Sequence, residues 1–216
     1  AELLYQSKVK KNQLGSFHHL DNSSTGLDFI HKWEPKPKHK DQLNNSFIAA
    51  GVAVGDIDND GLPDVFLSRQ ADGGRLYKNL GNFRFEDITL KSGIKSDEMW
   101  STGVTFADVN NDGWLDIFIC GFDSPNRLYI NQKTSFKESA EEYGLNYKGA
   151  SVVMSFSDFD LDGDLDLVAI EFEGTTQFYC YLNKLNLDGL KFNIMSNDWS
   201  LSQNCSVNYI IVAKKK

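Results

Sequence analysis

Short stretches in which larger apolar residues occupy every second position recur along the middle of the chain. They read GVAVG at 51–55, GVTFA at 103–107 and VMSFS at 153–157. A period of two is that of a β-strand packed on one face. Each stretch is followed, after a polar interval, by the continuous apolar runs VFL (65–67), IFI (117–119) and LVAI (167–170). Such runs are typical of strands buried on both faces.

The polar interval is acidic and nearly the same each time. It reads GDIDNDGLPD at 55–64, ADVNNDGWLD at 107–116 and SDFDLDGDLD at 157–166. Carboxylates this close together repel one another unless a cation neutralises them. For a single copy, a charged surface loop is the alternative to a cation-binding turn, which the charges favour. The first aspartates of the three copies lie 52 and 50 residues apart, however, and such a period indicates a repeat architecture.

The rest of each period also repeats. Leu-Tyr-Lys-Asn at 76–79 corresponds to Leu-Tyr-Ile-Asn at 128–131 and, more weakly, to Cys-Tyr-Leu-Asn at 180–183. Phenylalanines follow at similar offsets, at Phe85, Phe136 and Phe192. Together these segments supply four short strands to each unit of about fifty residues, which is typical of a propeller blade.

The sequence therefore predicts an all-β fold built from four-stranded antiparallel β-propeller blades. Three full blades are expected at 46–95, 98–146 and 148–197. Residues 1–45 are expected to form a lead-in with a partial blade, and residues 198–216 the start of a further blade or a closing strand.

An EF-hand is the competing interpretation of the acidic loops. That motif needs helices on both sides and a bidentate glutamate at its twelfth position. Here the twelfth positions are Leu67, Ile119 and Ala169, and the flanking residues have the pattern of strands. The EF-hand is therefore excluded. What remains is a nine-residue turn with side-chain oxygens at positions one, three, five and nine, a main-chain carbonyl at seven, and a glycine at six that permits the bend.

These motifs resemble the FG-GAP/VCBS repeats of integrin-type β-propellers, in particular those of the cartilage acidic protein-like group. The resemblance covers roughly residues 26–195, and the lead-in GLDFIH at 26–31 is similar to the way those propellers begin. It implies a ring of six or seven blades in which each acidic loop binds one calcium ion, hence about three ions here.

Carried over position by position, the resemblance implies three sets of metal ligands. The first is Asp56, Asp58, Asp60 and Asp64 with the carbonyl of Leu62; the second is Asp108, Asn110, Asp112 and Asp116 with the carbonyl of Trp114; the third is Asp158, Asp160, Asp162 and Asp166 with the carbonyl of Asp164. Asn110 departs from the aspartate found at the third position of the other loops. The second site is therefore expected to have one negative charge fewer than the other two.

Charge agrees with this interpretation. The chain has 30 acidic and 22 basic residues and a formal charge of −8, and eleven of the carboxylates are proposed ligands. Three calcium ions would bring the charge to about −2. Because nucleic-acid binders need a positive surface, this balance argues against them. The basic stretch 31–40 is expected to be a solvated loop, with contact to an anionic partner such as a sulfated glycan as the alternative.

The sequence indicates the cellular compartment and the state of the cysteines less specifically. Calcium sites of modest affinity stay filled where calcium is abundant, which favours a secreted, extracellular or periplasmic location. The first residues lack the pattern of a signal peptide, and no apolar run is long enough to cross a membrane. Cys120 is expected to be a buried thiol, and a Cys180–Cys205 disulfide is left open.

A non-catalytic binding or adhesion module with a protein or glycan partner is the function these features favour. All four histidines, at 18, 19, 31 and 39, precede the first repeat, and no nucleophile elbow, P-loop or dinucleotide fingerprint occurs. The alternative, implied by the resemblance alone, is the propeller part of a calcium-dependent polysaccharide lyase or of another carbohydrate-active enzyme. The inter-strand loops 69–74, 121–126 and 171–176 are the candidate contact residues. Open blade faces are expected to be prone to self-association.

Overall fold

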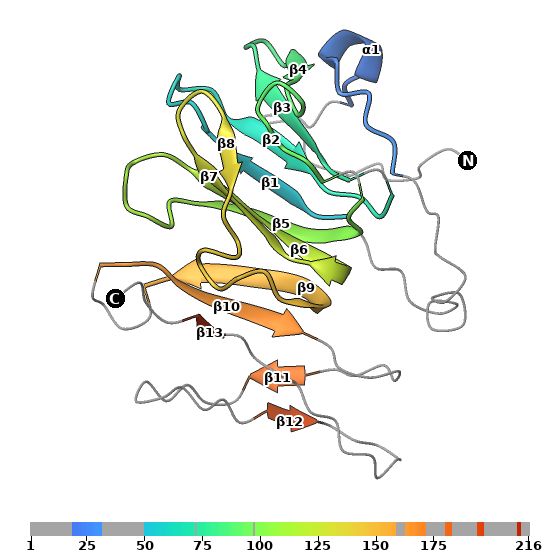
Figure 1. The fold of residues 1–216 in the computed structure, drawn as a ribbon. Helices are drawn as coiled ribbons and strands as arrows, with labels where there is room; N and C mark the ends of the chain where they lie inside the picture. Colours follow the sequence, from blue (N-terminus) through green and yellow to red (C-terminus); the bar gives the residue numbers. More distant parts are fainter. Residues whose placement is uncertain are drawn as a thin grey trace, which may run out of the picture.

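A computed structural model describes residues 19–31, 50–71, 73–96, 98–158, 163–171, 180–182, 194–196 and 211–212. Within these ranges the regular elements are one short helix and thirteen β-strands. The strands form antiparallel sheets that lie side by side in chain order (Figure 1). The predicted all-β fold of blade-like sheets is confirmed.

The first two blades have the predicted meander of four antiparallel strands. The first contains β1 (Val52–Gly55), β2 (Asp64–Leu67), β3 (Arg75–Asn79) and β4 (Phe85–Asp87), hydrogen-bonded in that order. The second contains β5 (Ser101–Ala107), β6 (Asp116–Pro125), β7 (Arg127–Asn131) and β8 (Phe136–Glu138), with the same neighbours. Corresponding residues keep the same register, since Val65 pairs with Tyr77 and Ile117 with Tyr129.

The third unit departs from this plan after its second strand. β9 (Lys148–Ser157) and β10 (Asp166–Glu171) pair as β1 and β2 do, but the other neighbour of β10 is β13 (Ile211–Val212). β11 (Cys180–Leu182) and β12 (Ile194–Ser196) pair with each other in a separate two-stranded sheet. The predicted bounds of the three blades are not tested further by the structure.

The second and third units are also joined through their sheets. The distal half of β6 pairs with the start of β9, placing Phe122 opposite Ala150 and Pro125 opposite Lys148. Elsewhere successive units meet through their first strands, because β1 lies beside β5, and β5 beside β9. In the described residues the units form an open array, not a closed ring (Figure 1).

Glycine is required where first strands approach one another. A Cβ on Gly51 would lie 2.7 Å from the carbonyl oxygen of Thr102, and one on Gly103 would lie 2.5 Å from that of Val152. Both distances are far inside van der Waals contact. The two glycines occupy the same position of their blades, so the close approach is itself repeated.

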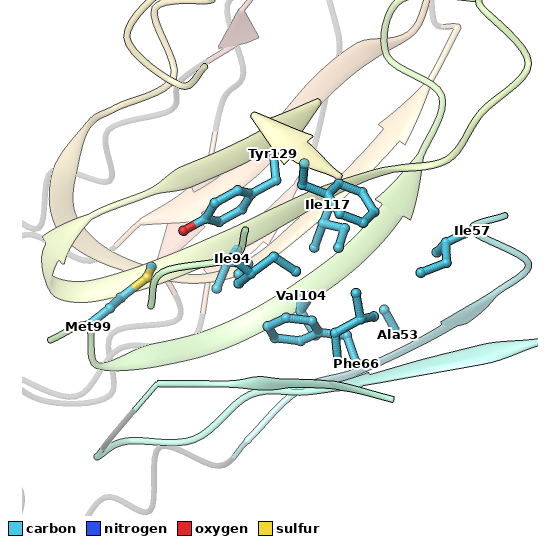
Figure 2. Close-up of a cluster of buried hydrophobic side chains, with 11 residues drawn as sticks. Ala53, Ile57, Phe66, Ile94, Met99, Val104, Ile117 and Tyr129 are labelled. Atoms are coloured by element: carbon cyan, nitrogen blue, oxygen red, sulfur yellow. The ribbon is translucent and has the colours of Figure 1, made fainter. Parts of the chain in front are cut away.

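The hydrophobic cores lie between blades. Figure 2 shows the first core, where Ala53 and Phe66 of the first blade meet Val104, Ile117 and Tyr129 of the second. The second core lies on the opposite face of β6 and contains Phe118, Cys120, Leu128, Met154 and Leu167. Adjacent residues of β6 therefore serve two different cores, which is why its apolar run is continuous. The expected burial of the Cys120 thiol is confirmed.

The outer face of the first blade has no such cover among the described residues. Val104 and Phe106 pack against the first blade, whereas their counterparts Val52 and Val54 are about 60% and 62% exposed. Self-association through this face stays a prediction.

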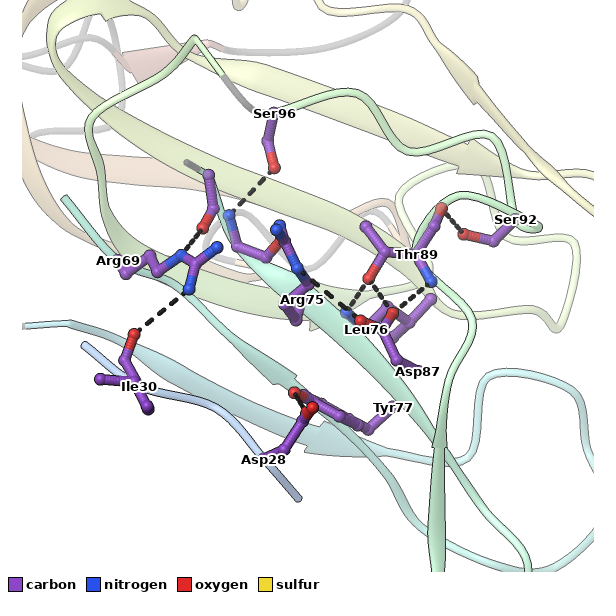
Figure 3. A network of polar contacts seen from close by, with 12 residues as sticks. Asp28, Ile30, Arg69, Arg75, Leu76, Tyr77, Asp87, Thr89, Ser92 and Ser96 are labelled. Carbon is purple, nitrogen blue, oxygen red and sulfur yellow. Dashed lines mark hydrogen bonds and ion pairs between the residues drawn. The ribbon is translucent and has the colours of Figure 1, made fainter. Parts of the chain in front are cut away.

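A helix of four residues, α1 (Asn22–Thr25), lies in the lead-in and was not predicted. The Asp21 side chain accepts a hydrogen bond from the Ser23 amide at its start, and Gly26 ends it with φ +77°. The following residues dock on the first blade (Figure 3). The Tyr77 hydroxyl donates to Asp28 at 3.0 Å, and Arg69 donates to the carbonyl of Ile30 at 3.2 Å.

The same contact recurs in the second blade. The hydroxyl of Tyr129 donates to the carbonyl oxygen of Lys95 at 2.7 Å, and Lys95 belongs to the connection that precedes this blade. Burial of Tyr77 and its bond to Asp28 raise the pKa of its hydroxyl. The hydroxyl of each tyrosine therefore links its blade to a preceding segment of the chain.

Candidate metal centres

The two fully described acidic loops connect the first and second strands of their blades. β1 ends at Gly55 and β2 begins at Asp64, while β5 ends at Ala107 and β6 begins at Asp116. The first carboxylate of each loop accepts hydrogen bonds from backbone amides later in the same turn. Asp56 accepts from the amides of Asp60 and Gly61 at 3.1 and 2.8 Å. Asp108 accepts from Asp112 and Gly113 at 3.0 and 2.8 Å.

The glycine at position six has the predicted role. Gly61, Gly113 and Gly163 have φ values of +87°, +84° and +95°, a region that residues with a Cβ rarely adopt. In the third loop the amide of Gly163 donates to Asp158 at 3.0 Å, as in the other two loops. All three turns are thus built by the same bond between positions six and one.

The carboxylate at position nine is buried and joins three segments. Asp64 and Asp116 are 0% and 1% exposed. Asp64 accepts from the amides of Ile57 at 3.0 Å and Asn79 at 2.7 Å. Asp116 accepts at the same two distances from Val109 and Asn131. Each carboxylate therefore fixes the start of its loop to both the second and the third strand.

Burial changes the acidity of these two groups. Loss of water contact raises the pKa of Asp64, and it raises the pKa of Asp116 to about 6, against the opposing effect of the amide bonds. A cation beside either carboxylate would favour its ionised form. The ninth position is thus where bound metal would change protonation most.

The first loop fits a hard divalent cation. One oxygen from each of Asp56, Asp58 and Asp64 lies within 4.8 Å of the others. The Oδ1 atom of Asp58 is buried and has no hydrogen-bond partner in the described part of the chain. An uncompensated buried carboxylate oxygen is costly, and an all-oxygen set of this kind is what calcium prefers.

The loops differ in which groups bond to positions three and five. In the first, the Lys78 ammonium contacts Asp58 and lies 3.1 Å from Asp60 Oδ2. In the second, the Asn110 amide nitrogen donates to Asp112 Oδ2 at 3.0 Å. The bond to Asp58 raises the pKa of Lys78, and a bond from the Leu62 amide, followed by Lys78, lowers that of Asp60. Lys78 was not predicted from the sequence, although it is the basic residue among the three that occupy the variable position of the Leu-Tyr-x-Asn motif.

Asparagines at position four link successive loops, which sequence analysis also missed. The Asn59 amide nitrogen donates to the carbonyl of Gly113 at 3.1 Å. The Asn111 amide donates to the carbonyl of Gly163 at 3.0 Å and to Asp164 Oδ1 at 2.8 Å. Both asparagines have left-handed φ values of +57° and +58°, which asparagine tolerates better than most residues. An asparagine at position four, next to the glycine-containing turn, was therefore the sequence feature that could have indicated this contact.

The repeated Leu-Tyr-x-Asn motif is explained by the same loops. The backbone amides of Asn79 and Asn131 donate to position nine, as described above. In addition, the side-chain amide of Asn79 donates to the carbonyl of Pro63 at 2.9 Å, and the side-chain amide of Asn131 donates to that of Leu115 at 3.0 Å. Asn131 also donates to the carbonyl of Ile57 in the first loop at 2.8 Å. The asparagine thus closes its own loop and, in the second blade, holds the preceding one.

The rest of the predicted ligand set is placed only in part. Asp160 and Asp162 lie outside the described residues, as does the side chain of Asp166, although its backbone begins β10. Coordination by the carbonyls of Leu62, Trp114 and Asp164 stays a prediction. The ring of Trp114 lies beneath the Lys133 ammonium, 5.5 Å from the ring centre.

The duplicated loop-and-strand unit also matches a known sequence family. A model described as FG-GAP-like repeat matches residues 56–119 and again residues 108–169, which together cover more than half of the chain. The chain belongs to the FG-GAP-like repeat family. Each match begins at the first aspartate of a loop and ends in the second strand of the following unit, so it spans the repeated geometry described above.

Similar curated proteins bear one name. This FG-GAP-like chain is 30% identical over 130 residues to cartilage acidic protein 1 of Xenopus tropicalis, covering 58% of the chain and 20% of that protein. For the protein of the same name from Mus musculus, the identity is 30% over 121 residues, covering 54% and 19%. For that of Homo sapiens it is 29% over 122 residues, covering 54% and 18%. The matched part is thus about a fifth of these relatives.

The candidate contact loops need correction. Arg69 and Gln70 are buried, and Arg69 donates to the carbonyl of Gly73 at 2.9 Å. Residues 121–125 are part of β6. Arg69 and Gln70 are therefore not exposed for contact, whereas residues 122–125 are half-buried and contact by them stays a prediction. Residues 172–176, Cys205 and the basic stretch from 32 onward lie outside the described residues. In the described part no helix has the length and apolar character needed to cross a membrane.

Replacement of Asn59 by glycine is expected to lower the free energy of unfolding by about 1 kcal/mol. Glycine keeps the left-handed backbone but removes the hydrogen bond to the second loop, and a net bond is worth ~0.5–1.5 kcal/mol. Urea denaturation measures the change. Asn82→Gly is the matched control, because Asn82 has φ +52° and lies at an exposed turn. Equal effects of the two changes would show that the bond between loops contributes nothing.

Without calcium, the contribution of Asp116 to the free energy of unfolding is expected to decline as pH rises from about 4 to about 6. The folded chain keeps a proton on Asp116 up to about pH 6, whereas an unfolded aspartate releases it near ~3.9. Since the folded state binds more protons in this window, raising the pH favours unfolding. Thermal melts in calcium-depleted buffer measure the slope, which Asp116→Asn should reduce. An unchanged slope in that variant would contradict the assignment.

Proposed function

We propose that this chain is a calcium-stabilised extracellular β-propeller module that binds a protein or glycan partner and is not an enzyme. The observation that carries the proposal is the duplicated loop, in which Asp56 and Asp108 organise the same turn and Asp64 and Asp116 are buried with the same partners. Such a cage of oxygens suits calcium. Membership of the FG-GAP-like repeat family supports it.

Calcium would act mainly on stability. A site filled to about 100 times its dissociation constant stabilises the folded state by roughly 2.7 kcal/mol. Several sites together would be comparable with the net stability of a domain, which is typically ~5–15 kcal/mol. Sites of modest affinity need abundant calcium, as found outside cells, and similarity to cartilage acidic protein 1 supports that location.

Partner binding is proposed at the end of the blades that carries the acidic loops. The β3–β4 turn lies at this end, where a Cβ on Gly81 would be 3.8 Å from the Leu62 side chain. Phe83 at its tip is 67% exposed and has φ +56°, and Leu80 is 45% exposed. A bulky residue held in the left-handed region is uncommon, and such strain is a reason to suspect a functional contact.

The enzyme alternative has less support. The described histidines, His19 and His31, are both exposed residues of the lead-in. The acidic side chains of the loops are engaged by backbone amides and by Lys78 or Asn110. A propeller belonging to a polysaccharide lyase remains the second candidate, favoured by the resemblance alone.

Calcium is expected to raise the melting temperature by several degrees relative to excess chelator. A change of 1 kcal/mol shifts the melting temperature of a domain of this size by roughly 2–4 °C, and each filled site contributes more than that. Circular dichroism melts of the full chain in millimolar calcium and in EDTA provide the test. Coincident melts would overturn the calcium-dependent part of the proposal.

Binding to a glycan or extracellular protein is expected to require calcium and to weaken when Phe83 is replaced by serine. Loss of a large exposed aromatic removes a typical anchor of an interface. Arrays of sulfated and uronic-acid glycans and of extracellular matrix proteins are probed with the calcium-loaded chain, and Leu90→Ser serves as an exposed control (Leu90 is 81% exposed). Conversion of a uronic-acid polymer to unsaturated products would favour the lyase instead.

A further inference from the structure

Lys78 reaches the first acidic loop from a neighbouring strand. It lies in β3, at the variable position of the Leu-Tyr-x-Asn motif, and its side chain is 30% exposed. The ammonium contacts Asp58 and lies 3.1 Å from Asp60 Oδ2. Both carboxylates are proposed calcium ligands. A fixed positive charge is therefore built into the site that a divalent cation would occupy.

The second blade has a different pair of residues at the two equivalent positions. Ile130 corresponds to Lys78, and Asn110 corresponds to Asp58. The first loop has four carboxylates and one ammonium, which leave a formal charge of −3; the second has three carboxylates and the same −3. Lys133 lies over the Trp114 ring, and no contact joins it to the second loop's carboxylates among the described residues. The expectation of a poorer second site therefore ignored Lys78.

The charge of Lys78 must oppose a bound divalent cation. In water, the interaction between two unit charges ~4 Å apart changes a binding constant by about fivefold. A divalent ion squares that factor, so one ammonium at this distance weakens binding by about 25-fold. Dissolved salt reduces the effect, because the site is partly exposed.

We propose that Lys78 is an affinity-determining residue of the first loop: its ammonium is an internal counter-ion that offsets the additional carboxylate of Asp58 and weakens calcium binding there. The inference rests on the proposed calcium binding by these loops. It means that the first loop keeps its carboxylates neutralised when calcium is scarce, and that the two loops bind calcium with similar affinity despite their different ligands.

The glycine at position six allows each loop to be observed separately. Gly61 donates to Asp56 and Gly113 donates to Asp108, both at 2.8 Å. Their amide signals in NMR spectra of the full chain therefore report calcium binding at the first and second loop under identical conditions. Calcium titrations are compared between the wild type, Lys78→Met and the charge-conserving control Lys78→Arg.

For Lys78→Met, the calcium midpoint seen at Gly61 is expected to fall by about 25-fold at low salt, while that at Gly113 stays unchanged. Lys78→Arg should leave both midpoints close to wild type. The double variant Asp58→Asn with Lys78→Met reproduces the residue types of the second loop, so its Gly61 midpoint should return toward the wild-type value. In calcium-depleted buffer, Lys78→Met should melt below the wild type, because the carboxylates lose their counter-ion.

The outcomes separate the two proposals. If neither glycine signal responds to calcium in any protein, the proposed function fails. If Gly61 responds in the wild type but its midpoint is the same in Lys78→Met, Lys78 does not set the affinity and this inference is overturned. Should Lys78→Met fold only with calcium, the midpoints of both proteins are compared in sucrose, which stabilises the folded state, and a Gly61 midpoint equal to that of the wild type there would equally contradict the inference.

Discussion

The buried carboxylate at position nine of the first two acidic loops is the constraint on which their blades depend. Asp64 receives one amide from the start of its loop and one from β3, so a single side chain joins the turn, the second strand and the third. Asp116 repeats this arrangement. A buried charge is costly unless it is hydrogen-bonded or paired with a cation, and these amides supply part of the compensation. The same side chain thus serves folding and the proposed metal site.

Packing between blades explains why the loops also contact one another. The second blade contributes to a different core on each of its two faces, as Ile117 and Phe118 show by facing opposite neighbours. First strands approach so closely that glycine is needed at 51 and 103, and the loops that follow them are brought within hydrogen-bond distance through Asn59 and Asn111. Successive loops are therefore joined directly by these asparagines, above the cores that join their blades.

Much of this could be predicted from the sequence because a repeat tests each inference several times. The alternating and continuous apolar runs identified the first two strands of each unit, and the glycine at position six identified the turn. The residues that were missed act through distant partners. Lys78 lies twenty positions from Asp58, Arg69 is buried by contacts to Gly73 and Ile30, and β10 pairs with the remote β13. Such tertiary partners leave no periodic signal. The helix α1 was not predicted, although the sequence contains its capping residues, Asp21 and Gly26.

Differences between the copies are as informative as their likeness. The backbone amides that hold positions one and nine are the same in the first two loops, so the turn has one geometry. The groups that bond to positions three and five differ: in the first loop an ammonium from β3 contacts both, and in the second the amide at position three donates to position five. A turn fixed by backbone bonds can tolerate this exchange, because its shape does not depend on which group supplies the compensation. The repeated geometry can therefore be retained while the charge around each site is changed from a neighbouring strand.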